Sequence, residues 1–326
     1  MTEDDETVER VIPRDAIPSI DDPSFGTSFS GSADSRVIVP DIEGAPDRAY
    51  PIRILDFHEI VNDVLGDLPI AVTWCPLCGT ATVYDRRIEG RGLTFGVSGK
   101  LAADNLVMYD RETESMWKQS TGRCLQGAFE GRSLRPLPFY MTTWAQYQWV
   151  NPEPRVLAET DMQSEAASAS DSPAQIDYDR DPYRRYFESD GYGLAAHRNE
   201  RQTRDWDRTD VDPKTPVIGL EIAGEAVGVP RPDLVERGVS TVTIGGQEIV
   251  VFGTPSGMYA YEDPGFSYAR ESAERFRADG TTWHVVSGEA ADGRSLVRVS
   301  TKREFAFTWQ DDHGPDAFLS PQVGGE

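Results

Sequence analysis

Four short strings in the first half of the chain recur in the same order in the second half. They are residues 37–44, 70–76, 95–99 and 131–134, which match residues 217–224, 249–255, 284–288 and 293–296. The first two matches lie at offsets of 180 and 179. Ordered self-similarity at one long period is the signature of a duplicated structural unit. The sequence therefore predicts two tandem related modules, at about residues 36–157 and 213–320.

Short runs rich in β-branched and aromatic residues, separated by glycine turns, fill both predicted modules. This pattern is typical of strands. We therefore expect an α+β fold that is predominantly β, with two tandem β-rich modules of which the second is degenerate. One helix is predicted at residues 52–64, where apolar residues recur at helical spacing. In that helix His58 with Asn62, and Glu59 with Asp63, would share faces.

Two segments outside the predicted modules have a different composition. Residues 1–35 are acidic and rich in serine and glycine, so we expect an extended, loosely packed arm. Residues 158–212 are predicted to be an acidic linker, with a flexible spacer at 163–173. Five aromatic residues between 178 and 192 indicate that this later part crosses a domain surface.

The chain is strongly acidic, with 55 Asp and Glu against 32 Lys and Arg and a formal net charge of -23. Only four of the basic residues are lysine, which are Lys100, Lys118, Lys214 and Lys302. A carboxylate-rich surface of this kind is typical of halophilic proteins, whose self-repulsion is screened by salt. It argues against a nucleic-acid partner, because phosphate backbones require a basic surface.

The sequence predicts a cytoplasmic protein without a membrane span. The first residues have no basic and apolar signal pattern, and no apolar run approaches the roughly 20 residues that cross a bilayer. In a reducing compartment three cysteines do not indicate a disulfide framework and instead favour metal or redox chemistry. The expected partner is a small ligand or a metal, and the sequence identifies no protein partner.

The clearest chemical motif is Cys75-Pro-Leu-Cys78, which lies between two strand-like runs. Two thiols three positions apart in a tight turn can ligate one metal or form one disulfide. A thioredoxin fold would require a helix at the first cysteine, but residues 79–84 favour turn and strand. The plainer alternative is that both cysteines are small buried hydrophobic residues.

A metal site needs more ligands than two thiolates. We predict His58 as the third ligand, which with Cys75 and Cys78 would suit zinc or copper. Other candidates are Cys124, Glu59, Asp63 and Asp104. The second module has Thr254 and Gly257 at the aligned positions and almost no counterpart of residues 101–126, so the site is expected in the first module only.

Two other functions stay open at this stage. In the first, the pair acts as a dithiol, or one thiolate acts as a nucleophile with His58 as base and Lys100 lowering its pKa. In the second, the cysteines are structural and a groove between the modules binds a partner. The residues expected to line a pocket around the turn are Asn62, Lys100, Arg111, Trp117 and Gln119.

Four strings of the first module resemble an uncharacterised family, the domain of unknown function 3179. They are residues 58–63 (HEIVND), 73–81 (TWCPLCGTA), 93–100 (LTFGVSGK) and 105–115 (NLVMYDRETES). The resemblance covers about residues 38–157 well and the second half weakly. It implies no established activity, cofactor or catalytic residue. Cys124 stands where relatives are expected to carry a small residue, which argues against an essential ligand there.

Overall fold

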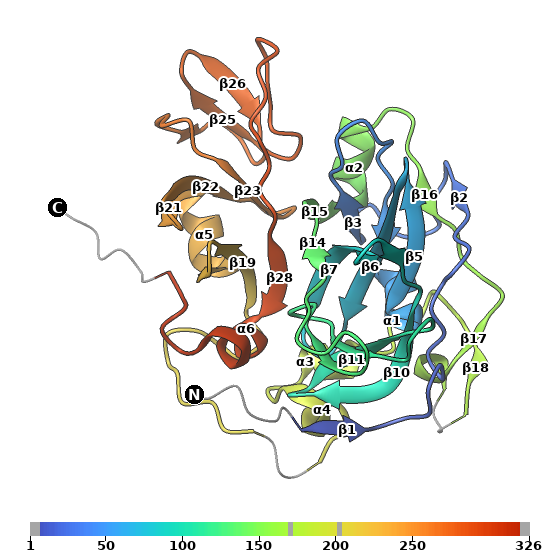
Figure 1. The fold of residues 1–326 in the computed structure, drawn as a ribbon. Helices are drawn as coiled ribbons and strands as arrows, with labels where there is room; N and C mark the ends of the chain where they lie inside the picture. The colour runs from blue at the N-terminus through green and yellow to red at the C-terminus, as the bar shows by residue number, and fades with distance from the viewer. Residues whose placement is uncertain (1–6, 169–171, 201–203, 320–326) are drawn as a thin grey trace.

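The structure is a computed structural model that describes residues 7–168, 172–200 and 204–319. It forms two lobes, one built mainly from the first half of the chain and one from the second (Figure 1). Most of the regular structure is β, with short helices at the ends of strands. The predicted α+β, β-rich class is therefore confirmed.

The same order of elements occurs in both halves. In the first half the elements are β3 (Arg36–Pro40), β4 (Tyr50–Pro51), α1 (Ile52–His58), β5 (Ile60–Leu65), β6 (Leu68–Cys75), β7 (Thr80–Asp85), β14 (Arg135–Pro136), β15 (Phe139–Thr143) and α2 (Trp144–Val150). In the second half they are β19 (Pro216–Ile222), β20 (Glu225–Pro230), α5 (Arg231–Arg237), β21 (Val239–Ile244), β22 (Gln247–Gly253), β23 (Met258–Glu262), β28 (Lys302–Phe305) and α6 (Ala306–His313).

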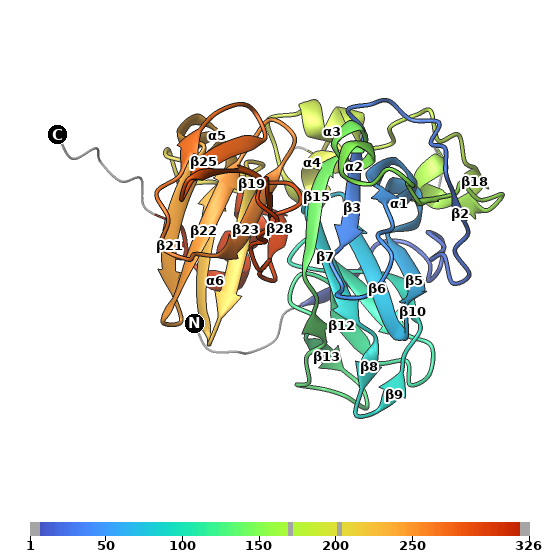
Figure 2. The ribbon, with the colours of Figure 1, turned by 90° about the horizontal axis from the view of Figure 1, so that it is seen from above.

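The two halves interlock, because each large sheet takes at least three strands from each half. One sheet has the order β20-β19-β28-β7-β6-β5, and β14 pairs with β7 beside it. The other has the order β21-β22-β23-β15-β3-β4. The halves meet at Arg303 opposite Ala81 in the first sheet and at Met258 opposite Met141 in the second. Figure 2 shows these central strands where the lobes join. Descent of the halves from one module stays a prediction.

A smaller meander interrupts the order in each half. In the first half it contains β10 (Phe95–Ala102), β11 (Asn105–Asp110), β12 (Met116–Lys118) and β13 (Cys124–Gln126), preceded by the hairpin of β8 (Arg87–Ile88) and β9 (Arg91–Gly92). In the second half it contains β24 (Ala269–Arg270), β25 (Arg275–Ala278), β26 (Thr281–His284) and β27 (Glu289–Ala290). The expectation that the second half lacks counterparts of residues 101–126 is therefore wrong. Its strands there are shorter and carry different side chains.

One of the four matched strings aligns differently in space. Residues 95–99 lie in β10, whereas residues 284–288 form the end of β26 and the next turn. Leu134 and Leu296 end the fourth pair of matched strings, and each donates its N–H to a glycine carbonyl. The acceptor is Gly122 at 3.0 Å in the first half and Gly288 at 2.9 Å in the second, so Gly288 corresponds in space to Gly122.

The register around the cysteine turn also differs from the sequence alignment by one residue. Cys75 pairs with Thr80 across the turn, as Gly253 pairs with Met258. The structural counterparts of Cys75 and Cys78 are therefore Gly253 and Ser256, not Thr254 and Gly257. The second half still has no thiol in this turn.

The predicted helix at residues 52–64 is half helix and half strand. Helix α1 ends at His58, and Glu59 adopts a positive φ of 56° that breaks it. Strand β5 then pairs with β6 from Ile60 opposite Thr73. The β-branched residues after Glu59 favour the strand. The predicted helical faces joining His58 to Asn62 and Glu59 to Asp63 therefore do not exist.

The N-terminal arm is docked, so the expectation of loose packing is wrong for residues 7–35. Its strand β1 (Val8–Arg10) pairs with β10, and β2 (Phe25–Gly26) pairs with β16 (Val156–Leu157). Ile17 and Ile20 are buried, and the Ile20 carbonyl accepts the Asn62 N–H at 2.8 Å. A few well-spaced apolar residues are enough to hold an otherwise acidic segment. Residues 1–6 lie outside the described residues.

The segment 158–212 crosses the first half of the molecule as a series of short elements. They are β17 (Gln163–Ser164), η1 (Glu165–Ala167), β18 (Ala174–Gln175), α3 (Arg184–Glu188) and α4 (Gly193–His197). Of the predicted spacer at 163–173, residues 169–171 lie outside the described part of the chain. The buried aromatic residues of this segment are Tyr178, Tyr183, Tyr186 and Tyr192.

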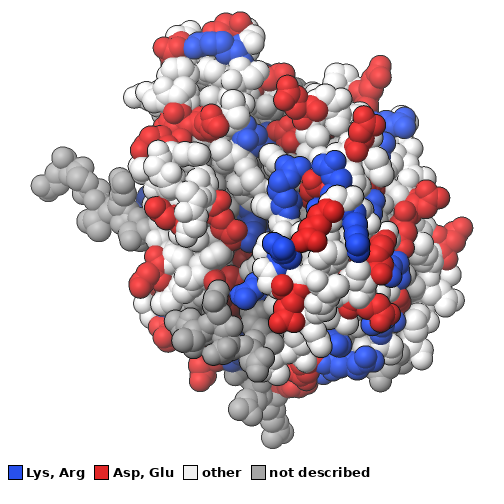
Figure 3. Space-filling view, in the orientation of Figure 1, with Lys and Arg blue, Asp and Glu red and all other residues white. Residues whose placement is uncertain are grey.

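The molecular surface carries both charges, and acidic side chains are spread over both lobes on the face in Figure 3. Several basic side chains gather beside the furrow between the lobes on that face. In the described ranges, the helices are too short and too polar for any of them to traverse a bilayer.

Candidate functional site

The two cysteines of the motif lie at one turn, as the flanking strands predicted. Cys75 is the last residue of β6, and Cys78 lies in the four-residue connection to β7. The turn closes with Gly79 at φ 59°, where a Cβ would lie 2.8 Å from the Phe305 ring. Both thiols are free and buried. Phe305, which belongs to the second half of the chain, therefore leaves no room for a side chain at position 79.

Cys75 lies in the wall of a pocket of about 320 Å³. One side of the pocket comes from β10 and β11, and the other from the N-terminal arm and the segment 158–212. The apolar lining residues are Val11, Ile12, Ile17, Leu77, Val97, Leu101, Leu106 and Leu194, and the polar or aromatic ones are Glu59, Lys100, Glu165, Ser168, Tyr183, His197 and Arg198. The pocket therefore combines an apolar wall with one thiol and several ionisable groups.

The surroundings of Cys75 favour its thiolate. Burial alone would raise its pKa, because a thiolate is costly away from water. The Cys78 side chain and the backbone of Leu106, Cys78 and Leu77 act in the opposite direction, and the pKa of Cys75 is lowered overall. Donors directed at a sulfur stabilise its charged form, which is the nucleophilic one.

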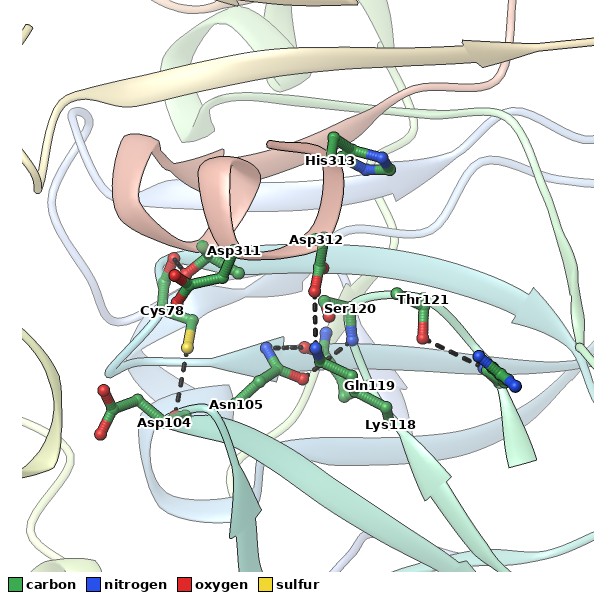
Figure 4. Close-up of polar contacts among 12 residues, drawn as sticks. Cys78, Asp104, Asn105, Lys118, Gln119, Ser120, Thr121, Asp311, Asp312 and His313 are labelled. Carbon is green, nitrogen blue, oxygen red and sulfur yellow. Dashed lines mark hydrogen bonds and ion pairs between the residues drawn. The ribbon is translucent and has the colours of Figure 1, made fainter. Parts of the chain in front are cut away.

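Cys78 lies behind Cys75 and has the opposite character. Its pKa is raised well above the ordinary value, by burial first and then by the hydrogen bond and charge of Cys75. Its Sγ lies 3.2 Å from the backbone oxygen of Asp104, as Figure 4 shows. Asp104 has a positive φ of 64° in the β10–β11 turn, and its carboxylate accepts the Leu194 N–H at 2.9 Å. The segment 158–212 thus fixes the turn that faces Cys78.

Glu59 is an acidic group that lines the same pocket as Cys75. Its carboxyl group is buried, and the pKa is raised by burial and then by the charges of Cys75, Glu165 and Asp56. The backbone holds it there, because the Glu59 carbonyl accepts the Trp74 N–H at 2.8 Å. A carboxyl group that keeps its proton to higher pH can donate it to a departing group.

The remaining polar wall of the pocket comes from α3 and α4. The rings of Tyr183 and His197 lie 5.2 Å apart, and burial followed by the charge of Arg198 lowers the pKa of His197. The imidazole is therefore favoured in its neutral form. Lys100 lines the same pocket.

A buried polar network supports the turn from below (Figure 4). Gln119 donates to the Thr73 hydroxyl at 2.9 Å and to the Thr80 carbonyl at 3.2 Å, so it connects the two strands that flank the cysteines. Asn105 donates to the side-chain amide oxygen of Gln119 at 3.4 Å, and its own side-chain oxygen accepts the Ser120 N–H at 2.9 Å. Gln119 therefore positions the turn and is absent from the pocket lining.

His58 does not join the cysteines. Its Nδ1 lies 2.9 Å from the Pro18 carbonyl, and its Nε2 lies 2.7 Å from the Tyr178 hydroxyl. Burial lowers the pKa of His58 to about 4. Across residues 7–168, 172–200 and 204–319, no three His, Cys, Asp or Glu side chains form a group that could hold a metal ion. Binding of zinc or copper stays a prediction.

The other candidate ligands have structural partners. Asp63 accepts from Arg48 at 2.7 Å and from the Tyr50 hydroxyl at 2.5 Å. Cys124 lies on β13 opposite Trp117, and burial raises its pKa to about 11. Neither residue belongs to the set that lines the Cys75 pocket.

Three predicted pocket residues hold the surrounding structure instead. Asn62 joins β5 to β10 by bonding both the N–H and the carbonyl of Phe95, at 2.9 and 2.8 Å. Arg111 contacts the docked arm, including Asp21 at 3.2 Å. Trp117 donates to Asp110 at 2.9 Å within the core.

Sequence reasoning missed the pocket residues that come from distant segments. Ile17 belongs to the arm, and Glu165, Tyr183 and His197 belong to the predicted linker. The aromatic content of residues 178–192 was the only signal for the second group. No local pattern indicated that Glu165 or Ile17 lies beside Cys75.

Comparisons with known proteins identify a family but no activity. A family model described as "Protein of unknown function (DUF3179)" matches residues 14–316. No curated protein and no solved structure matches the chain significantly.

Proposed function

The chain belongs to the DUF3179 family of proteins of unknown function, so its own residues must indicate the chemistry, and we propose that it is a thiol–disulfide oxidoreductase. In this proposal Cys75 is the attacking thiol and Cys78 the resolving thiol. The substrate is a small molecule that contains a disulfide and enters the pocket lined by Cys75.

The observation that carries this proposal is that two thiols share one turn and that only one of them, Cys75, lines the pocket. Cys75 lines the pocket and has a lowered pKa, whereas Cys78 lies behind it and has a raised pKa. An attacking thiol needs access and thiolate character, and a resolving thiol needs only proximity to the first sulfur. Metal binding by the same pair has less support, because the described residues bring no third ligand to it.

The reaction balances with the groups present and one disulfide substrate. The Cys75 thiolate attacks one substrate sulfur, so a mixed disulfide forms, the substrate S–S bond breaks and one thiolate leaves with the proton of Glu59. Cys78 then gives its proton to Glu59 and attacks Cys75 Sγ, which releases the second substrate thiolate. The substrate gains two electrons, and the cysteine pair loses two as its disulfide forms.

Trapping the mixed disulfide tests the proposal directly. With hydroxyethyl disulfide as the substrate, Cys78→Ser should accumulate an adduct on Cys75, located by mass spectrometry of peptides. Cys75→Ser should form no adduct at Cys78 and should lose turnover when dithiothreitol is the reductant. Cys124→Ala is the matched control, because it removes a buried thiol outside the pocket and should behave as the wild type.

Two results would contradict the proposal. One is an unmodified Cys75 in the Cys78→Ser protein after incubation with the disulfide. The other is stoichiometric zinc or copper in protein purified without an affinity tag, provided that Cys75→Ser abolishes the metal. The second result would assign the pair to metal binding.

A further inference from the structure

Three arginines converge where the two halves of the molecule meet. Arg36 of β3, Arg303 of β28 and Arg231 at the start of α5 line one small cavity. Arg36 and Arg303 also line a larger adjoining cavity of about 320 Å³. Neither cavity shares a lining residue with the Cys75 pocket. The arginine cluster is therefore a separate feature of the molecule.

The three guanidinium groups repel one another. Burial, followed by the charges of Arg36 and Arg231, lowers the pKa of Arg303 to about 9. Burial, followed by Arg231, also lowers the pKa of Arg36. Like charges brought together away from water destabilise a fold unless an opposite charge joins them. The chain has 55 acidic residues from which such a partner could have come.

Among the residues that the structure describes, no carboxylate forms an ion pair with any of the three, although the charges of Asp34 and Glu274 act to raise the pKa of Arg36. Arg231 donates to the Pro255 carbonyl at 3.0 Å, and Arg36 donates to the same carbonyl at 3.2 Å and to the Ser256 carbonyl. Arg303 donates to the Met141 thioether at 3.3 Å, which is a weak acceptor. A guanidinium has five N–H donors, so Arg303 keeps donors for a ligand in the cavity.

The positions that correspond to the three arginines in the other half of the chain are uncharged. Met141 and Arg303 stand at equivalent positions, each two residues before the N-cap of the helix that follows. Helices α1 and α5 begin after Pro51 and Pro230, so Ile52 and Arg231 are also equivalent. The counterparts of Arg303, Arg231 and Arg36 in the other half are Met141, Ile52 and Pro216. The matching elements of the other half thus carry no arginine at these three positions.

The larger cavity adds aromatic walls to the charge. Its lining includes Trp74, Phe187 and Phe305, and the rings of Phe187 and Phe305 lie 6.3 Å apart at a steep angle. We propose that this cavity binds a small aromatic molecule that carries a phosphate-type oxyanion. Converging guanidinium groups match a doubly charged tetrahedral oxyanion, and the aromatic side chains would contact the body of the molecule.

Calorimetric titration of the full chain tests the proposal at constant ionic strength in chloride. Phenyl phosphate should bind to the wild type, and inorganic phosphate should bind more weakly because it cannot contact the aromatic walls. Arg303→Met, which installs the residue of the equivalent position, should weaken phenyl phosphate at least about tenfold, as loss of one charge-assisted hydrogen bond predicts. Arg184→Gln is the matched control, because it removes an exposed arginine paired with Glu188 and should leave affinity unchanged.

Thermal unfolding provides a second measurement, in which Arg303→Met is expected to keep or gain stability although it loses ligand affinity. Without ligand, Arg303→Met should unfold at the same or a higher temperature, because it relieves repulsion. Phenyl phosphate should raise the unfolding temperature of the wild type but not that of Arg303→Met. Equal affinity of wild type and Arg303→Met, or no binding to the wild type, would overturn the proposal. Equal affinity for inorganic and phenyl phosphate would overturn its aromatic part.

Discussion

At the residue scale, the cysteine motif shows how neighbouring side chains of one type acquire different chemistry. Cys75 and Cys78 are both buried, so burial raises the pKa of each. The difference comes from the surroundings, because the Cys78 side chain and the backbone of Leu106, Cys78 and Leu77 lower the pKa of Cys75. One sulfur is thereby prepared for attack and the other keeps its proton.

The effect of a donor at position 78 on the Cys75 thiolate can be tested with two substitutions. Cys78→Ser keeps an O–H donor, whereas Cys78→Ala removes the donor. Alkylation of Cys75 by iodoacetamide at neutral pH should be roughly tenfold slower in Cys78→Ala than in Cys78→Ser, the factor that one hydrogen bond to a charged group supplies. Equal rates, followed by peptide mass spectrometry, would show that Cys78 does not stabilise the thiolate.

Asp56 should make the protein less stable as the pH rises. Burial raises its pKa from 3.8 to about 8, although its carboxylate accepts the Trp74 indole N–H at 2.8 Å. The folded state then keeps a proton that the unfolded state loses between pH 3.8 and about 8. Stability from this group is full below that window and falls through it, by at most about 1.4 kcal/mol per pH unit.

The variant Asp56→Asn keeps an oxygen for Trp74 and has no proton to lose. Its free energy of unfolding should therefore exceed that of the wild type near pH 8 and lack the Asp56 part of the slope. Urea unfolding at several pH values measures both quantities. Identical pH profiles for the two proteins would show that Asp56 ionises equally in both states. His58 contributes the opposite slope between pH 6.5 and about 4, because burial lowers its pKa.

At the scale of elements, the docked arm is the feature that most changes the site. It supplies one wall of the Cys75 pocket, and its backbone continues the pairing of β10 and β5. An acidic, glycine-containing segment is normally a candidate for disorder. Here a few apolar side chains enter the core and backbone hydrogen bonds fix the path.

Ile20→Ala measures how firmly the arm is docked. Ile20 is 1% exposed, so its truncation should cost about 2–5 kcal/mol in the free energy of unfolding. Val64→Ala is the control, because Val64 is 49% exposed and its loss should cost less than about 0.5 kcal/mol. Denaturant unfolding of both variants gives the comparison. A negligible effect of Ile20→Ala would mean that the arm contributes little to the fold.

At the scale of the whole molecule, the sharing of sheets couples the two halves. Each large sheet loses three or four of its strands if one half of the chain unfolds. Unfolding of the second half would expose the paired edges of β7 and β15, and unfolding of the first half would expose those of β28 and β23. The lobes visible in Figure 1 are therefore parts of one cooperative structure.

This coupling predicts a single unfolding transition for the full chain. Far-ultraviolet circular dichroism and tryptophan fluorescence should follow the same denaturant curve, since neither half has a complete sheet alone. Residues 213–320 expressed alone should not give a cooperative transition. Two separate transitions in the full chain, or a stably folded second half, would contradict the coupling.

The local sequence was sufficient for the strands, the turn and the pair of thiols. β-branched and aromatic runs on both sides of Cys75 and Cys78 favour strands, and the intervening residues permit only a short turn. The recurring strings likewise predicted similar elements in both halves. These features depend on residues close together in the chain, so their patterns remain visible without the fold.

Tertiary structure decided which residues surround those thiols and where the charges meet. Ile17, Glu59 and His197 reach the Cys75 pocket from three separate segments of the chain. Arg36 and Arg303 lie together only because both large sheets contain strands from both halves. Helix α1 ends at His58, so His58 does not share a helical face with Asn62 as its spacing in the sequence had predicted. Long-range pairing sets these positions, and local propensity carries no information about which distant strands will pair.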